Sequence, residues 1–237
     1  MSLEQSDVEL AATLDSLDDA HNYRDWIFSL VRPFINGPVL EVGAGHGTFT
    51  ELLAELGAVT AVEPSARAAG LLAERFAGDP RVAVVQGLLN DLPASPEFGA
   101  AVLINVLEHI PDDGAALDGL WQRLQPGGHL ALWVPAFPLL YSRFDGMLGH
   151  HRRYRRRPLR ALVEAHGFEV VDLRHVNSVG WFSWLIVARM LRQLPTKPRA
   201  VALYDRAVVP VLRAVETRVR PPFGQSLLFI ARRPARG

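Results

Sequence analysis

The chain has 237 residues, 49% of them hydrophobic, which is enough to bury the core of one sizeable α/β domain and excludes more than two small domains. Its 25 basic and 25 acidic residues balance, which excludes a global electrostatic attraction to nucleic acid or to an anionic membrane. The lack of cysteine excludes a disulfide framework and a cysteine nucleophile, and with an acidic N-terminus that has no signal-peptide pattern it predicts a cytoplasmic protein.

The N-terminal region, residues 1–38, is predicted to form a helical lid. Residues 1–20 form an acidic leader or a short helix, and we assign no chemistry to them. From Ala20 to Phe34 apolar residues recur at helical spacing, and Gly37-Pro38 ends the helix. Tyr23 on this helix can close over a ligand, and ordinary packing explains it equally well.

A glycine-rich turn follows the first predicted strand. Val39 to Val42 suit a buried strand, and Gly43, Gly45 and Gly47 come directly after it. A side chain at these positions would keep a ligand away from the backbone, and a helix that begins near Thr48 directs its free N–H groups to the same place. The turn therefore predicts a nucleotide or carboxylate site, with a structural loop as the alternative.

The second predicted strand, residues 59–62, ends at Glu63-Pro64. Glu63 lies twenty residues after Gly43, where an acidic side chain can accept hydrogen bonds from both hydroxyls of a ribose. The alternative for Glu63 is a surface carboxylate.

Strands and helices alternate through the rest of the chain. The further predicted strands are 82–86, 98–105, 129–134, 168–176 and 226–232, and the helices between and after them are 65–76, 115–124, 158–166 and an apolar helix from Trp181. This order predicts an α/β fold with a doubly wound, mostly parallel sheet and helices on both faces. The apolar stretch 179–191 is too short to span a bilayer and contains Arg189, so we expect no membrane span.

Either a dinucleotide or S-adenosylmethionine suits a glycine turn with a ribose-binding acid. Dinucleotide sites favour G-x-G-x-x-G, whereas this chain has Gly43-Ala44-Gly45-His46-Gly47 preceded by Glu41. That arrangement resembles the first motif of the class I S-adenosylmethionine-dependent methyltransferases. The resemblance extends over most of the chain, through residues 61–64, 105–110 and 124–128.

The resemblance implies a single methyltransferase domain of residues 1–237, with a Rossmann-like seven-stranded sheet whose last strand runs antiparallel between strands five and six. Residues 39–135 would bind S-adenosylmethionine, releasing S-adenosylhomocysteine, and residues 136–237 would form the acceptor side. The methionine part would lie over Gly43, Ala44, Gly45 and Gly47, and the ribose on Glu63. The other residues that it places at the cofactor are Tyr23, Glu41, Pro64, Gly87, Leu88, Leu89, Asn105 and Val106.

One departure from the family concerns the adenine site. These enzymes commonly carry an acid near position 88 that accepts a hydrogen bond from the adenine amine, and this chain has Leu88-Leu89. Backbone groups of that loop, or Asp91, would have to replace it.

An oxygen or nitrogen acceptor must present a lone pair to the methyl group, and histidine is the usual base near neutral pH. His109 is the first candidate, because the turn after the fourth strand opens toward the methyl group, and His150 or His151 is the second. A helix cap or packing explains His109 equally well.

The spacing of Asn105, Glu108 and His109 also resembles the divalent-ion ligands of some quinone-type O-methyltransferases. Asn105 replaces an acid of that set, so we expect no metal.

The segment from residue 140 to 154 resembles a bacterial methyltransferase subgroup of mostly undefined acceptors. Arginines at 152–157 can clamp an anionic acceptor through bidentate contacts, or form a solvated helix start. Trp181 can belong to an apolar wall, a dimer face or the core. The candidate acceptor-binding residues are Tyr141, Asp145, Arg152, Arg153, Tyr154 and Trp181.

These patterns together predict a methyltransferase that acts on oxygen or nitrogen of a small molecule, with an anionic or partly apolar acceptor. A natural-product C-methyltransferase and a non-catalytic cofactor-binding protein are the alternatives, and RNA methylation is disfavoured because one basic patch on a neutral chain is a poor nucleic-acid footprint. We expect a monomer or homodimer, no nucleic-acid partner, and an acceptor that is either soluble or carried on a lipid at a membrane surface.

Overall fold

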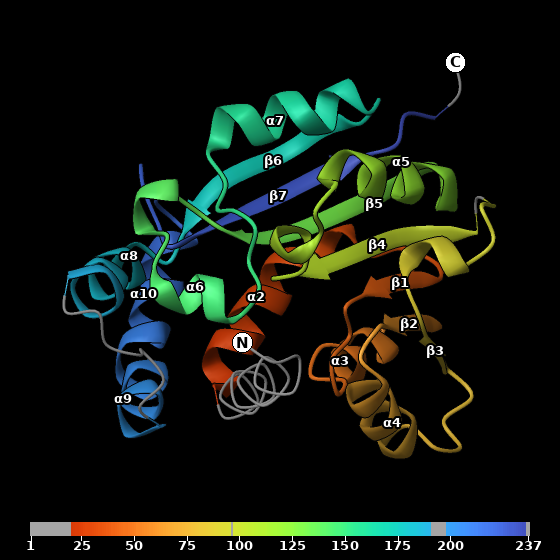
Figure 1. Cartoon of the computed structure of the whole chain (residues 1–237), viewed down its shortest axis with the longest axis horizontal. Helices are drawn as coiled ribbons and strands as arrows, with labels where there is room; N and C mark the ends of the chain where they lie inside the picture. The colour runs from red at the N-terminus through yellow and green to blue at the C-terminus, as the bar shows by residue number, and fades with distance from the viewer. Residues whose placement is uncertain (1–19, 96, 191–197, 236–237) are drawn as a thin grey trace.

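The computed structural model describes residues 20–95, 97–190 and 198–235, and the predicted acidic leader falls almost wholly outside them. Its sheet has seven strands in the order β3-β2-β1-β4-β5-β7-β6 (Figure 1). The strands are β1 (Val39–Val42), β2 (Val59–Glu63), β3 (Val82–Gln86), β4 (Phe98–Ile104), β5 (Leu124–Pro135), β6 (Glu169–Val176) and β7 (Ser226–Arg232).

Helices lie on both faces of this sheet and at one end of it (Figure 1). The α-helices are α2 (His21–Val31), α3 (Thr50–Ala54), α4 (Ala66–Arg75), α5 (Asp113–Arg123), α6 (Arg143–Met147), α7 (Arg156–Ala165), α8 (Ser178–Trp184), α9 (Pro198–Leu203) and α10 (Val209–Glu216). Short 3-10 turns are η1 (Arg32–Phe34), η2 (Leu89–Asp91), η3 (Leu107–His109) and η4 (Pro138–Leu140), and η5 (Leu185–Met190) and η6 (Tyr204–Val208) are π-helical.

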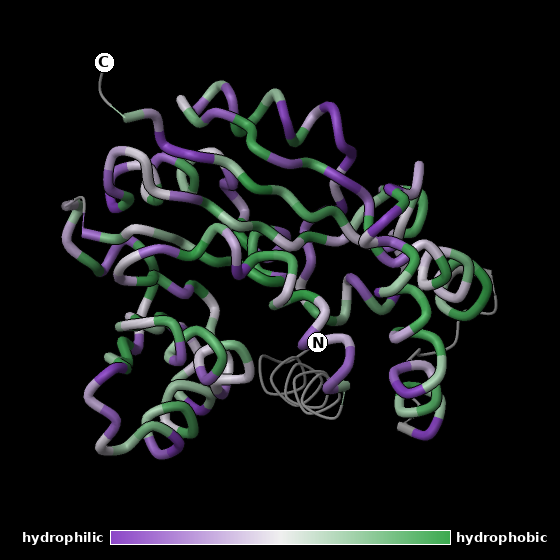
Figure 2. Tube along the Cα trace, turned by 180° about the vertical axis from the view of Figure 1, so that it is seen from behind, coloured by the Kyte–Doolittle hydropathy of each residue, from purple (hydrophilic) through white to green (hydrophobic). Residues whose placement is uncertain are grey.

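The core has two layers, one on each face of the sheet. Because successive side chains of a strand point to opposite faces, Leu103 of β4 packs with α5 and α7, while its neighbour Val102 packs with α2, α3 and α10. The strands are therefore apolar on both faces, and the trace in Figure 2 is coloured hydrophobic along much of the sheet.

The predicted fold class is confirmed. Strands β1 to β5 pair in parallel, and β7 pairs antiparallel with both β5 and β6, as the family resemblance implied. Strand β5 begins at Leu124, before the predicted start at residue 129, because Gly127 and Gly128 exchange backbone hydrogen bonds with Arg233 and so extend the strand. Helix α3 begins at Thr50 and has only five residues.

The sheet order places a topological switch between β1 and β4. From β1 the chain continues to β2 and β3 on one side, and from β4 it continues to β5 on the other. In such sheets ligands bind beyond the carboxyl ends of the strands at this point. Gly43, which follows β1, and Asn105, which follows β4, both have a positive φ, of 71° and 53°. The backbone thus bends sharply at both sides of the switch.

Helices α8, α9 and α10 with α6 stand over the carboxyl end of the sheet (Figure 1). Asp205 joins this group to α2, because its carboxylate accepts hydrogen bonds from the backbone N–H groups of Asn22 and Tyr23, at 3.1 and 2.8 Å. The apolar stretch that begins at residue 179 is helical as far as residue 190, and Leu191 lies outside the described residues. Among the described residues, no helix combines the length and apolarity required to cross a bilayer.

Candidate functional site

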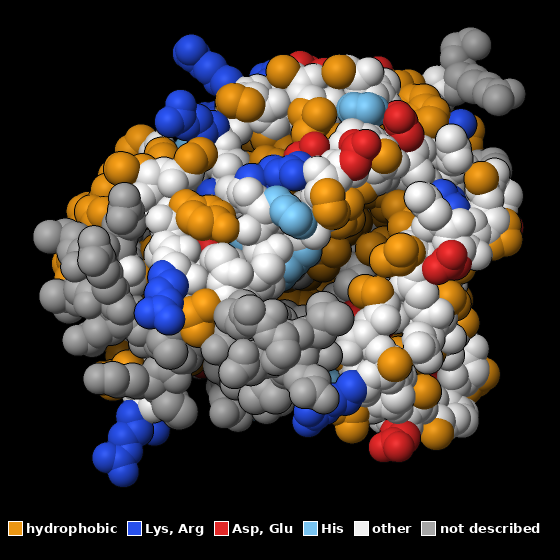
Figure 3. All heavy atoms as spheres, in the orientation of Figure 1, with side chains coloured by type: hydrophobic (Ala, Val, Ile, Leu, Met, Phe, Trp, Pro, Cys, Tyr) orange, Lys and Arg blue, Asp and Glu red, His pale blue; other side chains and the backbone are white. Residues whose placement is uncertain are grey.

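A cavity of about 940 Å³ opens at the switch point, between the carboxyl ends of the strands and the helices above them. The turns after β1, β2 and β4 form its floor, and residues of α2, α6, α8, α9 and α10 form its walls. The space-filling view shows a hollow with hydrophobic side chains in its wall and histidine at its edge (Figure 3).

The glycine turn forms part of this floor. A Cβ atom at Gly43 would lie 2.5 Å from Val106 Cγ2, so only glycine fits there, and Gly45 also has a positive φ, of 59°. Both residues line the cavity, whereas Ala44 and Gly47 do not. A Cβ at Gly47 would meet Phe76 and Leu72 instead, so the third glycine permits close packing against α4.

Glu63 is fixed in place before any ligand binds. Its two carboxylate oxygens accept hydrogen bonds from the backbone N–H groups of Gly45 and Ser65, each at 2.8 Å. It is only 6% exposed, yet it lines the cavity together with Pro64. Each oxygen keeps a lone pair, so the carboxylate is available to the two hydroxyls of a ribose.

Glu41 lies behind the turn and does not line the cavity. Its carboxyl group is buried and accepts a hydrogen bond from Thr50 Oγ1 at 2.5 Å. Burial raises the pKa of Glu41 to about 8, against the opposing effect of the Thr50 hydroxyl. Glu41 therefore joins the end of β1 to the start of α3. It supports the glycine turn from behind and does not face the cavity.

The loop after β3 supplies a further wall of the cavity through Gly87, Leu88 and Leu89. Leu88 is 62% exposed and offers an apolar surface of the kind that an adenine ring can lie on. Asp91, which we considered as a replacement for the missing acid, accepts a hydrogen bond from the Leu88 N–H at 2.7 Å and does not line the cavity. The backbone groups of this loop are thus the polar groups nearest to that wall.

Asn105, Val106 and Tyr23 also line the cavity. Asn105 donates its backbone N–H to the Trp133 carbonyl at 2.7 Å, which holds the end of β4 against β5. The Tyr23 ring makes edge contacts with Trp26 and Trp133, and burial raises the pKa of its hydroxyl. Tyr23 is therefore a rigid, neutral wall.

His109 and His150 meet in the wall of the cavity. Their ring centroids are 4.5 Å apart, and both rings line the cavity. Burial, followed by the nearby His150 and His151, lowers the pKa of His109 to about 4. His109 is thus neutral at pH 7 and has a lone pair, but its low pKa makes it a weak general base.

Glu108 lies beside these two histidines and is fully buried. No other residue of the described part of the chain forms a hydrogen bond with its carboxylate oxygens, and burial raises its pKa to about 8. We expected no metal because Asn105 replaces an acid, but the structure places His150, and not Asn105, next to Glu108 and His109.

Asp145 is the fixed charge behind the acceptor end. It is fully buried, and hydrogen bonds from His150 and from Arg153 hold its pKa at about 2, although burial alone would raise it. The Arg153 Nε lies 2.6 Å from Asp145 Oδ1, and the guanidinium lies 4.7 Å from the Trp184 ring centroid. Arg153 lines the cavity, so the Asp145–Arg153 pair presents a positive group there.

The other predicted acceptor residues do not line the cavity. Arg152 pairs with Asp113 at 2.7 Å, and the buried Tyr154 hydroxyl bonds to the Leu107 carbonyl at 3.2 Å. His151 is exposed, and the Tyr141 hydroxyl bonds to the His150 carbonyl at 2.7 Å. Trp181 packs against aromatic side chains away from the opening, namely Phe137, Phe182 and Phe223.

Several lining residues come from the helices after β6, and no sequence motif marks them. Asn177 has a positive φ of 65°, and its side chain accepts hydrogen bonds from the Gly180 N–H and from the Tyr204 hydroxyl. Gln225 belongs to no recognisable motif, and its side-chain oxygen accepts a hydrogen bond from the Asn177 amide. No local pattern could have indicated that residues so far apart share a wall.

Comparison with known proteins supports a common origin for this architecture. A family model described as a methyltransferase domain matches residues 18–173, which is more than half of the chain. The ubiquinone biosynthesis O-methyltransferase of Xylella fastidiosa (strain 9a5c) is 37% identical over 105 residues, 41% of this chain and 42% of that protein. Ribosomal RNA small subunit methyltransferase A of Parasynechococcus marenigrum (strain WH8102) is 44% identical over 90 residues, 36% of this chain and 30% of that protein. This chain spans less than half the length of either relative.

A solved structure shows the same fold over nearly the whole chain. Phosphoethanolamine N-methyltransferase 2 of Haemonchus contortus, in complex with S-adenosyl-L-methionine, matches with a TM-score of 0.61 and 14% identity. The match covers 92% of this chain and 57% of that one. The fold implied by the glycine turn and its associated motifs is thereby confirmed.

Proposed function

The chain belongs to the methyltransferase domain family, and we propose that it transfers the methyl group of S-adenosylmethionine to an oxygen or nitrogen atom of a small, partly apolar molecule. The observation that carries this proposal is that one cavity joins the glycine turn and Glu63 at one end to His109, His150 and Arg153 at the other. A donor and an acceptor can therefore meet inside a single enclosed space.

The residues at the first end fit the cofactor. The bare backbone at Gly43 and Gly45 admits its methionine part, the Glu63 carboxylate suits the ribose, and Leu88 suits the adenine ring. When bound, S-adenosylmethionine supplies an electrophilic methyl group, and S-adenosylhomocysteine is the product. The chain's own part is to hold the reacting atoms in line and to exclude water, which can supply about 7–11 kcal/mol of the barrier.

The residues at the second end indicate the acceptor. Apolar groups dominate this wall, among them Ile110, Phe144 and Trp184, and they suit an apolar body. Of the described residues that line the cavity, only Arg153 carries a permanent positive charge. An acceptor with an apolar body and one anionic or ionisable oxygen satisfies both features, and the similarity to a ubiquinone O-methyltransferase favours oxygen over nitrogen.

The exposed side chains of α9 and α10 indicate whether the acceptor is dissolved in water or carried on a lipid. Leu203 ends α9, Val211 and Val215 lie four residues apart on α10, and Val219 follows α10; all four are more than half exposed. Five arginines in residues 198–220 are exposed, whereas both acids in that range, Asp205 and Glu216, are buried. An apolar stripe flanked by arginine is typical of a helix that lies on an anionic membrane, which favours an acceptor carried on a lipid.

A labelled-methyl assay tests the proposed function. Purified protein is incubated with methyl-labelled S-adenosylmethionine and with three fractions of a bacterial extract: solvent-soluble lipids, water-soluble small molecules and RNA. We expect label in the lipid fraction, and none with Glu63→Ala, which cannot hold the ribose. Label in RNA alone, or cofactor binding without transfer to any fraction, contradicts the proposal.

A further inference from the structure

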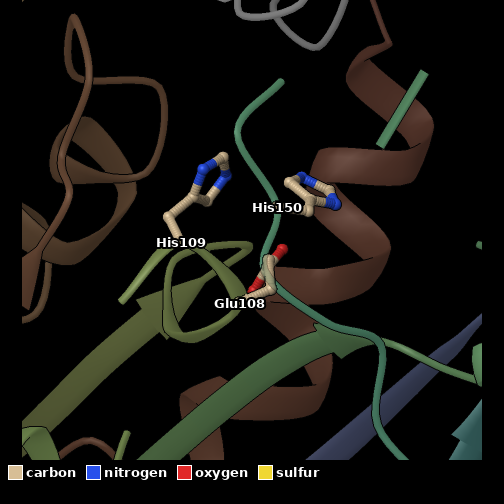
Figure 4. A group of neighbouring side chains, drawn as sticks. All are labelled: Glu108, His109 and His150. Atoms are coloured by element: carbon tan, nitrogen blue, oxygen red, sulfur yellow. The ribbon is translucent and has the colours of Figure 1, made fainter. Parts of the chain in front are cut away.

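Three side chains with metal-binding atoms come together (Figure 4), and the two histidines among them line the cavity. Glu108 and His109 lie on η3, directly after β4, and His150 follows α6, about forty residues later in the chain. The ligand atoms of the three all lie within 4.8 Å of one another. In Figure 4 the Glu108 carboxylate points toward the space between the two imidazole rings.

The Glu108 carboxylate is the first indication that something binds here. It is completely buried, and neither oxygen has a hydrogen-bond partner among the described residues. Buried carboxylates are normally paired, hydrogen-bonded or bound to a metal, because an isolated one is costly. The nearby Arg153 does not pair with it, since its Nε is bonded to Asp145.

The orientation of His150 is the second indication. Its Nδ1 lies 3.2 Å from Asp145 Oδ1, so Nδ1–H can donate a hydrogen bond to the carboxylate and Nε2 remains as the nitrogen for a metal. Asp145 is itself held by Ser142, whose N–H and hydroxyl both donate to Oδ2 at 2.8 Å. A carboxylate that fixes the far side of a histidine ring is the usual support of a metal ligand.

We propose that Glu108, His109 and His150 bind a divalent first-row transition-metal ion of the Zn²⁺ type. Two imidazoles and one carboxylate suit such an ion, whereas Mg²⁺ prefers oxygen ligands and keeps several waters. Three protein ligands leave a coordination position open, and since both histidines line the cavity, that position faces it.

The open position gives the ion a role in the reaction, and this step rests on the proposed function. An acceptor hydroxyl that binds the ion loses its proton more readily, because the positive charge stabilises the resulting oxyanion. The oxyanion then attacks the methyl carbon of the sulfonium: the new O–C bond forms, the S–C bond breaks, and its electron pair stays on sulfur. The hydroxyl proton leaves to water.

Metal binding itself is measured without acceptor or cofactor. Untagged protein is stripped with EDTA, dialysed, and titrated with Zn²⁺ or Co²⁺ alone; we expect one bound ion per chain and a visible absorption band from bound Co²⁺. Glu108→Gln and His150→Gln should abolish the band. Asp145→Asn leaves all three ligands in place but removes the carboxylate that orients His150 and pairs with Arg153, and it should weaken binding by about 10–100-fold. His151→Gln is the matched control, since His151 is adjacent and exposed, and it should bind normally.

A stability measurement separates a metal site from a merely buried carboxylate. In EDTA, Glu108→Gln and the wild type should melt at similar temperatures, because a buried carboxyl group without a partner takes up a proton and is then uncharged like the amide. Zn²⁺ should raise the melting temperature of the wild type and leave that of Glu108→Gln unchanged, since only the wild type gains from the ion. If Zn²⁺ shifts the two proteins equally or not at all, or if the wild type binds no Co²⁺, the proposed site does not exist. Binding of S-adenosylhomocysteine in EDTA tests the cofactor site separately, so that the two proposals can fail independently.

Discussion

Replacing Gly43 by alanine tests the glycine turn, which is the feature on which the cofactor site depends. The new Cβ would lie 2.5 Å from Val106 Cγ2 and 3.1 Å from its Cγ1, closer than such atoms can approach. The residue also has φ of 71°, which costs an L-residue about 1–2 kcal/mol. Forcing Val106 aside adds about 1–3 kcal/mol, as overpacked cores do.

The expected destabilisation is therefore about 2–5 kcal/mol, which lowers the melting temperature by about 5–15 °C in a chain of this length. Because the displaced backbone is also the proposed cofactor surface, we expect the Kd for S-adenosylhomocysteine to rise at least about tenfold, equivalent to about 1.4 kcal/mol. Calorimetric titration and thermal denaturation measure the two effects.

A double variant identifies the cause. Val106→Ala removes both Cγ atoms. The double variant Gly43→Ala with Val106→Ala should therefore recover the stability lost through steric overlap, but not the stability lost because alanine disfavours a positive φ. Gly70→Ala is the matched control: it lies in the interior of α4, nothing lies within 4 Å of its Cβ, and it should gain about 0.5–1 kcal/mol. Normal stability and binding of Gly43→Ala would refute this reasoning.

Three further predictions concern individual carboxylates. Glu63→Gln should weaken S-adenosylhomocysteine binding by about 10–100-fold, because one of the two oxygens is replaced by an NH₂ group that faces a backbone N–H. Calorimetry measures the Kd, and an unchanged Kd would show that Glu63 does not hold the ribose. Asp205→Ala should cost about 1–2 kcal/mol and lower the melting temperature, because it removes the cap of α2 and frees Tyr23; a melting temperature equal to the wild type would contradict this role. Because the pKa of Glu41 is raised from 4.5 to about 8 in the folded protein, its contribution to stability should be full below pH 4.5 and be lost as pH rises toward 8, by up to about 1.4 kcal/mol per pH unit. Burial raises the pKa of Glu108 to about 8 as well, so Glu41→Gln should reduce the difference in stability between pH 5 and pH 8 without removing it. An equal difference in both proteins would exclude Glu41 as a source.

The sheet and the glycine turn could be predicted because their signals are local. A strand that runs into Gly43 and Gly45, and an acid twenty residues later at Glu63, fix the backbone shape and the spacing over short stretches of chain. The strand order followed from the family resemblance and was confirmed. The role of Gly47 was not visible, because packing against α4 and contact with a ligand both require glycine at such a position.

The acceptor side could be predicted only in part, because distant residues build it. The basic run at 152–157 looked like one anion clamp, but burial separates its members: Arg153 turns inward to Asp145, while Arg152 pairs with Asp113. Asp205 reaches the start of α2 across 183 residues, and no spacing rule links such positions. Likewise His150 joins Glu108 only through tertiary packing, so the sequence pointed to Asn105 as the third position.

The central claim, that the switch-point cavity holds S-adenosylmethionine and serves methyl transfer, is tested most directly by calorimetric titration with S-adenosylhomocysteine and, in a parallel experiment, with NAD⁺. The cavity's bare turn at Gly43 and the fixed Glu63 carboxylate predict binding of S-adenosylhomocysteine at one site per chain, much weakened in Glu63→Gln. Binding of NAD⁺ with no detectable binding of S-adenosylhomocysteine would contradict the account.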